Sequence, residues 1–215
     1  MSKLANMVTP VTGGSRGIGA AIAKRLAAEG ASVAITYAED AAAASAVVKA
    51  IELAGGKAVA IQADAVKVEA VKGAVEKAVA ALGRLDVLVN HAGTAILKPF
   101  EETTLEEMDH VLNINVRGVF VTTQAGLKHM NDGGRIINIG SGVGERAQAR
   151  GLLPYSATKG AAKMFTQALS REVGGRGITV NNVRPGPTDT DLNPASGDRA
   201  VRQKAITALN RFGPR

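Results

Sequence analysis

Short runs rich in β-branched residues alternate with longer alanine-rich stretches along the whole chain. The short runs have the length and composition of buried strands, and the longer stretches have the apolar spacing of helices packed against a sheet. This alternation is typical of βαβ units, whose right-handed crossovers produce a parallel sheet with helices on both faces. The sequence therefore predicts a doubly wound α/β fold that binds its ligands at the carboxyl ends of the strands.

The pattern gives approximate bounds for each element. Strands are predicted at residues 7–12, 32–36, 58–62, 86–90, 135–139 and 179–184. Helices are predicted at residues 18–29, 41–54, 67–82, 105–130, 155–173 and near 198–209. Glycines that can take the left-handed conformation stand where helices should end, at positions 30, 55–56, 83, 133–134 and 174–175. Pro10 is awkward because proline cannot donate to a sheet ladder, so either the first strand starts at Val11 or the position is strained.

Composition limits the classes of protein to be considered. With 215 residues and 46% hydrophobic content, residues 1–215 are expected to form a single domain. Cysteine is absent and the three histidines lack ligand spacing, so neither a disulfide nor a metal site is expected. No apolar run suits a signal peptide or a membrane helix, so we expect a cytoplasmic protein with no membrane partner.

The net charge of +7 raises the question of an anionic partner. The basic residues are scattered, and aromatic side chains for base stacking are scarce, so no nucleic-acid partner is expected. A solvated basic surface is the simplest interpretation, with an anionic cofactor or an acidic carrier protein as the alternative.

A glycine-rich loop directly follows the first predicted strand and opens a helix, with the sequence Thr12-Gly13-Gly14-Ser15-Arg16-Gly17-Ile18-Gly19. Glycines at this spacing permit a tight turn and a close approach of the backbone to a pyrophosphate. The helix N-terminus adds free N–H donors and the positive end of the helix dipole. The loop therefore predicts dinucleotide binding within a Rossmann fold, against the alternative of a purely structural turn.

The end of the second strand indicates which dinucleotide is bound. An acidic residue there usually holds the ribose 2′-hydroxyl of NAD. Here Thr36 and Tyr37 take that place, Glu39 and Asp40 come late, and Arg16 could meet a 2′-phosphate. The sequence thus favours NADP(H), with NAD(H) possible.

Tyr155 and Lys159 are four residues apart at the start of a predicted helix and so share one face. A phenol titrates near pH 10, and a neighbouring ammonium should lower that pKa and suit the phenol to proton transfer. Ser141 follows the fifth predicted strand, where its hydroxyl could hold a carbonyl oxygen, although a serine after a strand is usually a turn residue. Together these residues suggest acid–base chemistry on a carbonyl or alcohol.

In these motifs the chain resembles the short-chain dehydrogenase/reductase family, and more closely its 3-oxoacyl-(acyl-carrier-protein) reductase-like members. The loop at 12–19 matches the family's TGxxxGxG, and Asn90-His91-Ala92-Gly93 matches its NNAG. Asn115, Ser141, Tyr155 and Lys159 match the family's active-site residues, and the segment 185–190 matches the one that holds the nicotinamide carboxamide. The resemblance implies a ketoreductase that moves hydride between a nicotinamide cofactor and a small-molecule carbonyl or acyl thioester.

The resemblance also implies a role for each site residue. Tyr155 would donate the proton, Lys159 would bind the ribose and lower the tyrosine pKa, Ser141 would orient the carbonyl, and Asn115 would hold a water. The implied cofactor-binding residues are Gly13, Ser15, Arg16, Gly17, Ile18, Gly19, Tyr37, Asp64, Ala65, Asn90, Ala92, Gly93, Tyr155, Lys159, Pro185, Gly186 and Thr188.

Some of these positions have a simpler alternative. Asn115 could compensate a local irregularity of its helix, and Asp86 is expected to have a structural role. His91 stands where the family usually has a second asparagine, and its bulkier ring changes that strand end.

The end of the chain also differs from the family pattern. Members generally continue beyond residues 211–215 into another helix and a seventh strand, so the natural chain is expected to be longer, and they commonly form homotetramers. A dimer or tetramer is therefore expected here as well.

Two functions from different classes remain open at this point. The first is an NADP(H)-dependent ketoreductase, and the second is a nucleotide-binding sensor or regulatory module without catalysis. The substrate should contact the segments 142–154 and 189–202, since loops carry specificity in such folds. Basic residues there could favour an acidic carrier or a phosphopantetheine thioester, namely Arg146, Arg150, Arg199, Arg202 and Lys204.

Overall fold

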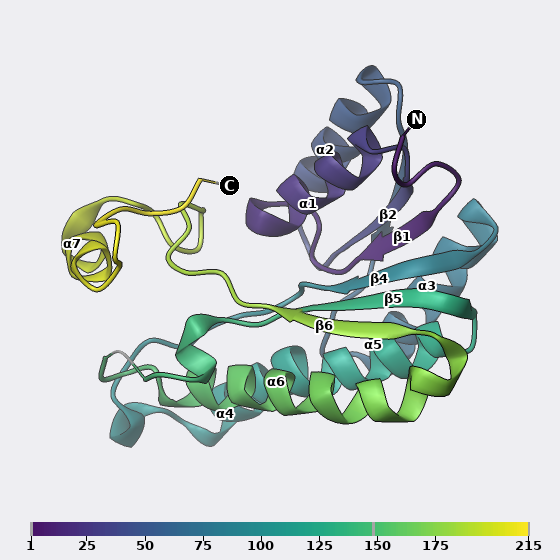
Figure 1. Ribbon diagram of the computed structural model, residues 1–215. Helices are drawn as coiled ribbons and strands as arrows, with labels where there is room; N and C mark the ends of the chain where they lie inside the picture. Colours follow the sequence, from purple (N-terminus) through teal and green to yellow (C-terminus); the bar gives the residue numbers. More distant parts are fainter. Residues whose placement is uncertain (1, 148, 215) are drawn as a thin grey trace.

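A parallel sheet forms the centre of the computed structural model, which describes residues 2–147 and 149–214 (Figure 1). In this part of the chain the strand order is β3-β2-β1-β4-β5-β6, and every pairing is parallel. The strands are β1 (Val8–Val11), β2 (Ser32–Tyr37), β3 (Lys57–Gln62), β4 (Leu85–Asn90), β5 (Met130–Ile139) and β6 (Thr179–Val183). This confirms the predicted doubly wound fold, whose order reverses between β1 and β4 and opens a crevice at the carboxyl ends of these strands.

Helices cover both faces of the sheet. On one face lie α1 (Gly17–Ala28) and α2 (Ala41–Leu53), and on the other α3 (Val68–Leu82), α4 (Leu105–Leu112), α5 (Gly118–Leu127) and α6 (Leu153–Val173) (Figure 1). Short 3-10 turns occur at η1 (Phe100–Glu102), η3 (Gly142–Gly144) and η4 (Gly174–Arg176). The last helix, α7 (Gly197–Ala205), lies apart from the sheet, beyond the end of β6. No helix in the described ranges is long and apolar enough to cross a bilayer.

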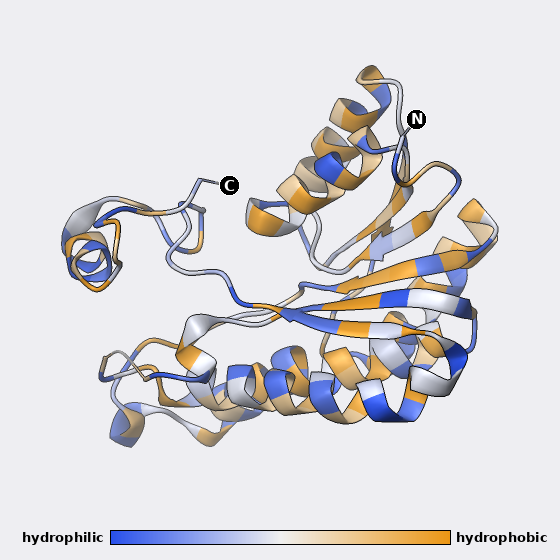
Figure 2. Ribbon diagram, viewed as in Figure 1, coloured by the Kyte–Doolittle hydropathy of each residue, from blue (hydrophilic) through white to orange (hydrophobic). Residues whose placement is uncertain are grey.

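The core is built from aliphatic side chains on the strands and small residues on the helices. Val11, Val33 and Ile35 are fully buried under α1 and α2, where Ala23 lets α1 approach closely. On the opposite face Leu88 packs against α3, α5 and α6. Figure 2 shows largely hydrophobic strands between helices of mixed character. Burying each such aliphatic side chain contributes about 1.5–3 kcal/mol, which fixes the sheet that carries the site.

Pro10 lies inside β1, paired in register with Ala34, so the prediction that the strand might start only at Val11 was wrong. The N–H of Val8 donates to Asp86 Oδ2 (2.9 Å) and that of Thr12 to the carbonyl of Val89 (3.0 Å), both on β4. Because N–H groups alternate along a strand, the nitrogen of Pro10 also faces β4. Proline thus removes one ladder bond to β4, and the Asp86 carboxylate supports the same edge, which confirms a structural role for that residue.

The single helix predicted at 105–130 was wrong in its middle and at its end. The helical path contains a π-helix, η2 (Asn113–Arg117), between α4 and α5, and α5 ends at Leu127. Met130 begins β5, where it pairs with Leu85, and Gly133 and Gly134 lie within that strand rather than at a helix end. The apolar spacing continues across these residues, so it could not mark either the π turn or the early start of the strand.

Most other bounds agree with the prediction to within one to three residues. The exception is the last helix, which ends at Ala205 rather than near residue 209.

Candidate active site

The glycine loop is tied to the ends of β2 and β4 by hydrogen bonds. The N–H of Gly13 donates to Thr36 Oγ1 (3.1 Å), and the N–H of Gly14 donates to the Thr36 carbonyl (2.9 Å). On the other side, Thr12 Oγ1 accepts from the N–H groups of His91 (2.9 Å) and Ala92 (3.0 Å). The loop therefore has a fixed shape at the point where the strand order reverses.

The N-terminus of α1 is open to an anion. Its N-cap, Arg16, makes no side-chain capping hydrogen bond. Within the described residues, no hydrogen bond is donated by the N–H groups of Gly17, Ile18 and Gly19. A Cβ on Gly19 would lie 2.5 Å from both the Gly13 carbonyl oxygen and His91 Nδ1, so only glycine allows this close packing. Free donors at a helix start in a glycine cradle fit the pyrophosphate of a dinucleotide.

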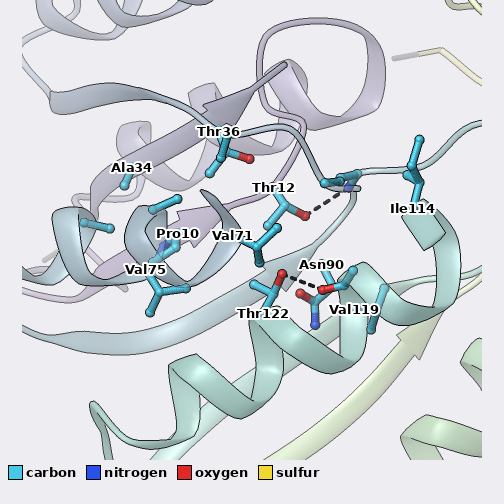
Figure 3. A pocket seen from close by; sticks show the side chains of 16 residues that line it. Pro10, Thr12, Ala34, Thr36, Val71, Val75, Asn90, Ile114, Val119 and Thr122 are labelled. Carbon is cyan, nitrogen blue, oxygen red and sulfur yellow. Dashed lines mark hydrogen bonds between the residues drawn. The ribbon is translucent and has the colours of Figure 1, made fainter. Parts of the chain in front are cut away.

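A mostly apolar cavity adjoins the loop on the α3 and α5 side of the sheet (Figure 3). Its volume is about 540 Å³, including the part open to solvent. Three predicted cofactor residues line it, namely Ala65, Asn90 and Ala92. Asn90 is 3% exposed, and its Oδ1 has no hydrogen-bond partner within the described residues. An apolar cleft with few polar groups is typical of ligand pockets.

Two acidic residues near the ends of β2 and β3 have other partners. Asp40 Oδ1 caps α2 by accepting from the N–H of Ala43 (2.8 Å). Asp64 Oδ1 accepts from the N–H of Val66 (3.0 Å). At the end of β2, the partly buried Tyr37 takes the place of the acidic residue of a typical NAD site, and the exposed Glu39 comes two residues later.

Tyr155 and Lys159 lie one turn apart on α6, as predicted. Lys159 is 8% exposed, and its Nζ lies 5.6 Å from the centre of the Tyr155 ring. The same Nζ donates to the carbonyl oxygen of Ile139 at the end of β5 (2.8 Å). This bond joins the helix that carries the phenol to the strand that leads to Ser141.

Ser141 faces the phenol from the end of β5. Its hydroxyl is near enough to the phenol to oppose the rise of the Tyr155 pKa, and its Oγ accepts from the N–H of Val143 (3.4 Å). The turn that follows rests directly on α6, because a Cβ on Gly144 would lie 2.6 Å from the carbonyl carbon of Lys159. Glycine at this position lets Ser141 and Tyr155 approach each other.

Burial dominates the electrostatics of the pair. It raises the pKa of Tyr155 above its usual value, against the opposing effects of the nearby Ser141 hydroxyl and the positive charge of Arg199. Burial also lowers the pKa of Lys159 to about 8. The net shift of the Tyr155 pKa is therefore upward, opposite to the predicted lowering. The phenol is protonated at neutral pH, which suits it to donate a proton.

Asn115 lies in the π-helix η2, so the irregularity considered as an alternative role is present. Its Nδ2 donates to the carbonyl of Thr94 (2.8 Å) and to Thr158 Oγ1 (3.0 Å), and its Oδ1 accepts from the Thr94 N–H (2.8 Å). Thr158 in turn donates to the carbonyl of Tyr155 (2.7 Å). Asn115 thus joins the segment after β4 to the helix of the candidate acid, and its predicted water stays a prediction.

The segment after β6 returns to the glycine loop. Pro185 and Gly186 follow the strand, and Thr188 forms a parallel bridge with Gly213. A Cβ placed on Gly17 would lie 3.5 Å from Thr190 Cγ2. The structure therefore brings the predicted residues at the ends of all six strands to one edge of the parallel sheet.

Residues 7–200 match the family model described as short chain dehydrogenase. The chain belongs to this family. It is 47% identical to an uncharacterized oxidoreductase of Methylorubrum extorquens, over 99% of this chain and 87% of that protein. It is 41% identical to the hydroxynaphthalene reductase arp2 of Aspergillus fumigatus, over 88% of this chain and 69% of that protein.

A solved structure is closely similar as well. The crystal structure of a short chain dehydrogenase from Burkholderia cenocepacia in complex with NADP has a TM-score of 0.97 and 49% identity, covering 99% of this chain and 86% of that one. This short-chain dehydrogenase is thus an oxidoreductase with NADP-binding homologues.

Sequence reasoning missed several threonines that hold the site of this dehydrogenase together. Thr12 and Thr36 fix the glycine loop, and Thr158 links Asn115 to α6. Thr12 begins the glycine motif and Thr158 stands between Tyr155 and Lys159, so their positions were a signal that could have been used. Two of the basic residues suggested for an acidic carrier have other contacts, since Arg150 pairs with Glu101 and Lys204 lies over the Phe212 ring.

Proposed function

We propose that this short-chain dehydrogenase is an NADP(H)-dependent reductase of small-molecule carbonyl compounds, with Tyr155 as the proton donor. One observation carries the proposal: the buried Lys159 lies one helical turn from Tyr155 on α6, with its Nζ 5.6 Å from the centre of the phenol ring, and Ser141 lies nearby at the end of β5. In this proposal residues 1–215 act as one dinucleotide-binding and catalytic domain.

The chain's own residues would position and protonate the substrate. The nicotinamide of the cofactor supplies the hydride when it is bound. Tyr155 donates its phenolic proton to the carbonyl oxygen, and the Ser141 hydroxyl orients that oxygen by a hydrogen bond. Lys159 places a positive charge beside the phenol, which stabilises the phenolate left after the proton has moved. Asn115 holds the segment after β4 against α6, so that the cofactor and the acid keep a fixed distance.

In this proposal the cofactor binds where the chain has free hydrogen-bond donors. The amides at the start of α1 receive the pyrophosphate. Arg16 is exposed and has no ion-pair partner in the described ranges, so it is available to a 2′-phosphate, while Asp40 is engaged in capping α2. These features favour NADP(H) over NAD(H).

We also propose that the substrate is of the kind reduced by 3-oxoacyl-(acyl-carrier-protein) reductases. We infer that the substrate contacts the segments 142–154 and 189–202, which lie on either side of Tyr155 in the sequence. We also propose a homo-oligomer, because α4, α5 and α6 expose large apolar side chains on the same side of the sheet, among them Leu105, Phe120 and Met164.

The test is an assay of NADPH consumption with aliphatic ketones, aromatic ketones and quinones, and 3-oxoacyl thioesters, with NADH as the comparison cofactor. We expect at least one carbonyl class to be reduced, with NADPH preferred. Binding of NADPH without reduction of any carbonyl would instead favour a sensor or regulatory module.

A further inference from the structure

His91 contacts the glycine loop through one nitrogen of its ring. Nδ1 lies 3.2 Å from the carbonyl oxygen of Thr12 and 3.1 Å from that of Gly13. Carbonyl oxygens only accept hydrogen bonds, so Nδ1 must carry a proton to make either contact. In a neutral ring the other nitrogen, Nε2, then carries none.

The ring fills a space that two glycines leave open. A Cβ on Gly19 would lie 2.5 Å from His91 Nδ1 and 2.8 Å from its Cε1, and a Cβ on Gly13 would lie 3.3 Å from Nδ1. The imidazole is therefore wedged between the turn of the loop and the first residues of α1. A flexible or smaller side chain would leave this space partly empty.

The loop is held from both sides as a result. His91 Nδ1 donates to the carbonyls of Thr12 and Gly13, while Thr36 accepts from the N–H groups of Gly13 and Gly14. The peptide planes at the start of the loop are thus fixed at their donor and acceptor ends. The N–H groups left free are those at the start of α1, which are the donors that a pyrophosphate needs.

His91 acts here as a neutral donor rather than as a cation. Burial lowers its pKa, and the positive charge of Lys159 lowers it further, against the effect of the two carbonyl contacts. At neutral pH the ring therefore contributes shape and one hydrogen-bond donor, and no charge that would attract a phosphate directly.

We propose that His91 is a positioning residue for the cofactor: its Nδ1–H holds the glycine loop in the shape that binds the pyrophosphate. This inference rests on the proposed NADP(H) binding. It assigns to the histidine a role that its polar neighbour Asn90 cannot take, because the side chain of Asn90 turns to Thr123 and Asn138 on the opposite side.

The test compares NADPH dissociation constants, measured directly by fluorescence titration, for three variants. His91→Leu removes the donor that the carbonyls of Thr12 and Gly13 share and should weaken NADPH binding at least about tenfold, because the loop is then held from one side only. His91→Asn places an amide N–H close to the position of Nδ1 and should stay within about threefold of the unaltered protein. His129→Leu is the matched control, because His129 is exposed and precedes the amino end of β5, far from the loop in sequence and at the opposite edge of the sheet.

Kinetics separate positioning from general damage to the protein. The KM for NADPH should rise with the dissociation constant in His91→Leu, while the KM for the carbonyl substrate moves far less. If His91→Leu does not fold, nitrogen NMR of the unaltered protein still decides the case, since it identifies the protonated ring nitrogen. We expect it to be Nδ1.

Either of two results overturns the inference: a ring protonated on Nε2 alone, or NADPH binding by His91→Leu that equals that of the unaltered protein. If the unaltered protein binds no NADPH, both this inference and the proposed function fail. If it binds NADPH but reduces no carbonyl, only the proposed function fails, and the variants still test His91.

Discussion

The two sides of the candidate site are held together in different ways. On the cofactor side, β1, β2 and α1 pack closely around glycines, and the space that these glycines leave is filled by the backbone, two threonine hydroxyls and the ring of His91. On the catalytic side, β5, β6 and α6 meet through buried polar side chains, and the site depends on the hydrogen bonds that these side chains make.

Asn138 is the centre of the polar network on the catalytic side. It is 1% exposed, its Oδ1 accepts from Asn90 Nδ2 (2.8 Å), and its Nδ2 donates to Thr166 Oγ1 on α6 (2.9 Å). Asn90, Asn138 and Asn182 lie side by side in register on β4, β5 and β6. The strands that lead to His91, Ser141 and Pro185 are therefore fixed to one another close to their ends.

The comparison predicts opposite sensitivities. The cofactor side should be most sensitive to an added methyl group, and the catalytic side should be most sensitive to the loss of a buried hydrogen bond. The variants below test this contrast, in order of decreasing expected effect.

Replacing Lys159 with methionine should lower turnover at least about 1,000-fold, because the charge beside Tyr155 is lost. The same change should stabilise the fold at pH 7 by up to about 2–3 kcal/mol, since the buried ammonium is charged below its folded pKa of about 8. The stability gain should shrink as the pH rises from about 8 towards the unfolded value of 10.5. Denaturant unfolding at several pH values, with turnover measured in parallel, checks both effects. A variant that is less stable at pH 7 would contradict the predicted stabilisation.

Adding one methyl group at Gly19 should weaken NADPH binding about 100-fold, because the new Cβ would meet the Gly13 carbonyl and His91 at 2.5 Å. Gly73→Ala is the control, since a Cβ there meets nothing within 4 Å and lies inside α3. The control should bind NADPH normally and be more stable by about 0.5–1 kcal/mol. Equal NADPH affinity in both variants would show that the lack of a Cβ at Gly19 is not needed for the loop to bind the cofactor.

Asn138→Leu should destabilise the protein by roughly 1–3 kcal/mol, because buried partners on β4 and α6 lose a hydrogen bond. Turnover should fall about tenfold and more than NADPH affinity does, since the strand that carries Ser141 is the one released. Asn181→Leu, on the exposed side of β6, is the matched control. The contrast between the two sides breaks down if Asn138→Leu impairs NADPH binding more than turnover.

Mild acid should produce the smallest effect, through His91. Its folded pKa lies below the unfolded value near 6.5, so its contribution to stability is complete above that pH and is lost as the pH falls through the folded pKa. Lys159 titrates well above this window. The thermal unfolding temperature should therefore fall between pH 7.5 and about 5, and it should fall less in His91→Asn. If the unfolding temperature falls equally in both proteins, other groups cause the loss of stability.

Much of the fold could be predicted from sequence because its signals are local. Alternating apolar runs located the strands, and the glycine loop stood directly between a strand and a helix. The face shared by Tyr155 and Lys159 followed from helical spacing alone.

What could not be predicted depends on contacts between distant residues. The π turn at Asn115 leaves the apolar spacing intact, and Met130 belongs to a strand because of its pairing with Leu85. The raised pKa of Tyr155 depends on how deeply the folded chain buries the phenol, which no spacing reveals. The threonines and asparagines of the network likewise gain their partners only in the folded protein.

Turnover of the Tyr155→Phe variant tests the central claim most directly. The substitution removes one oxygen from the phenol beside Ser141 and leaves Lys159, the glycine loop and the asparagine network in place. We predict that NADPH binds with nearly unchanged affinity while carbonyl reduction falls at least about 1,000-fold. Carbonyl reduction at the rate of the unaltered protein would contradict the account.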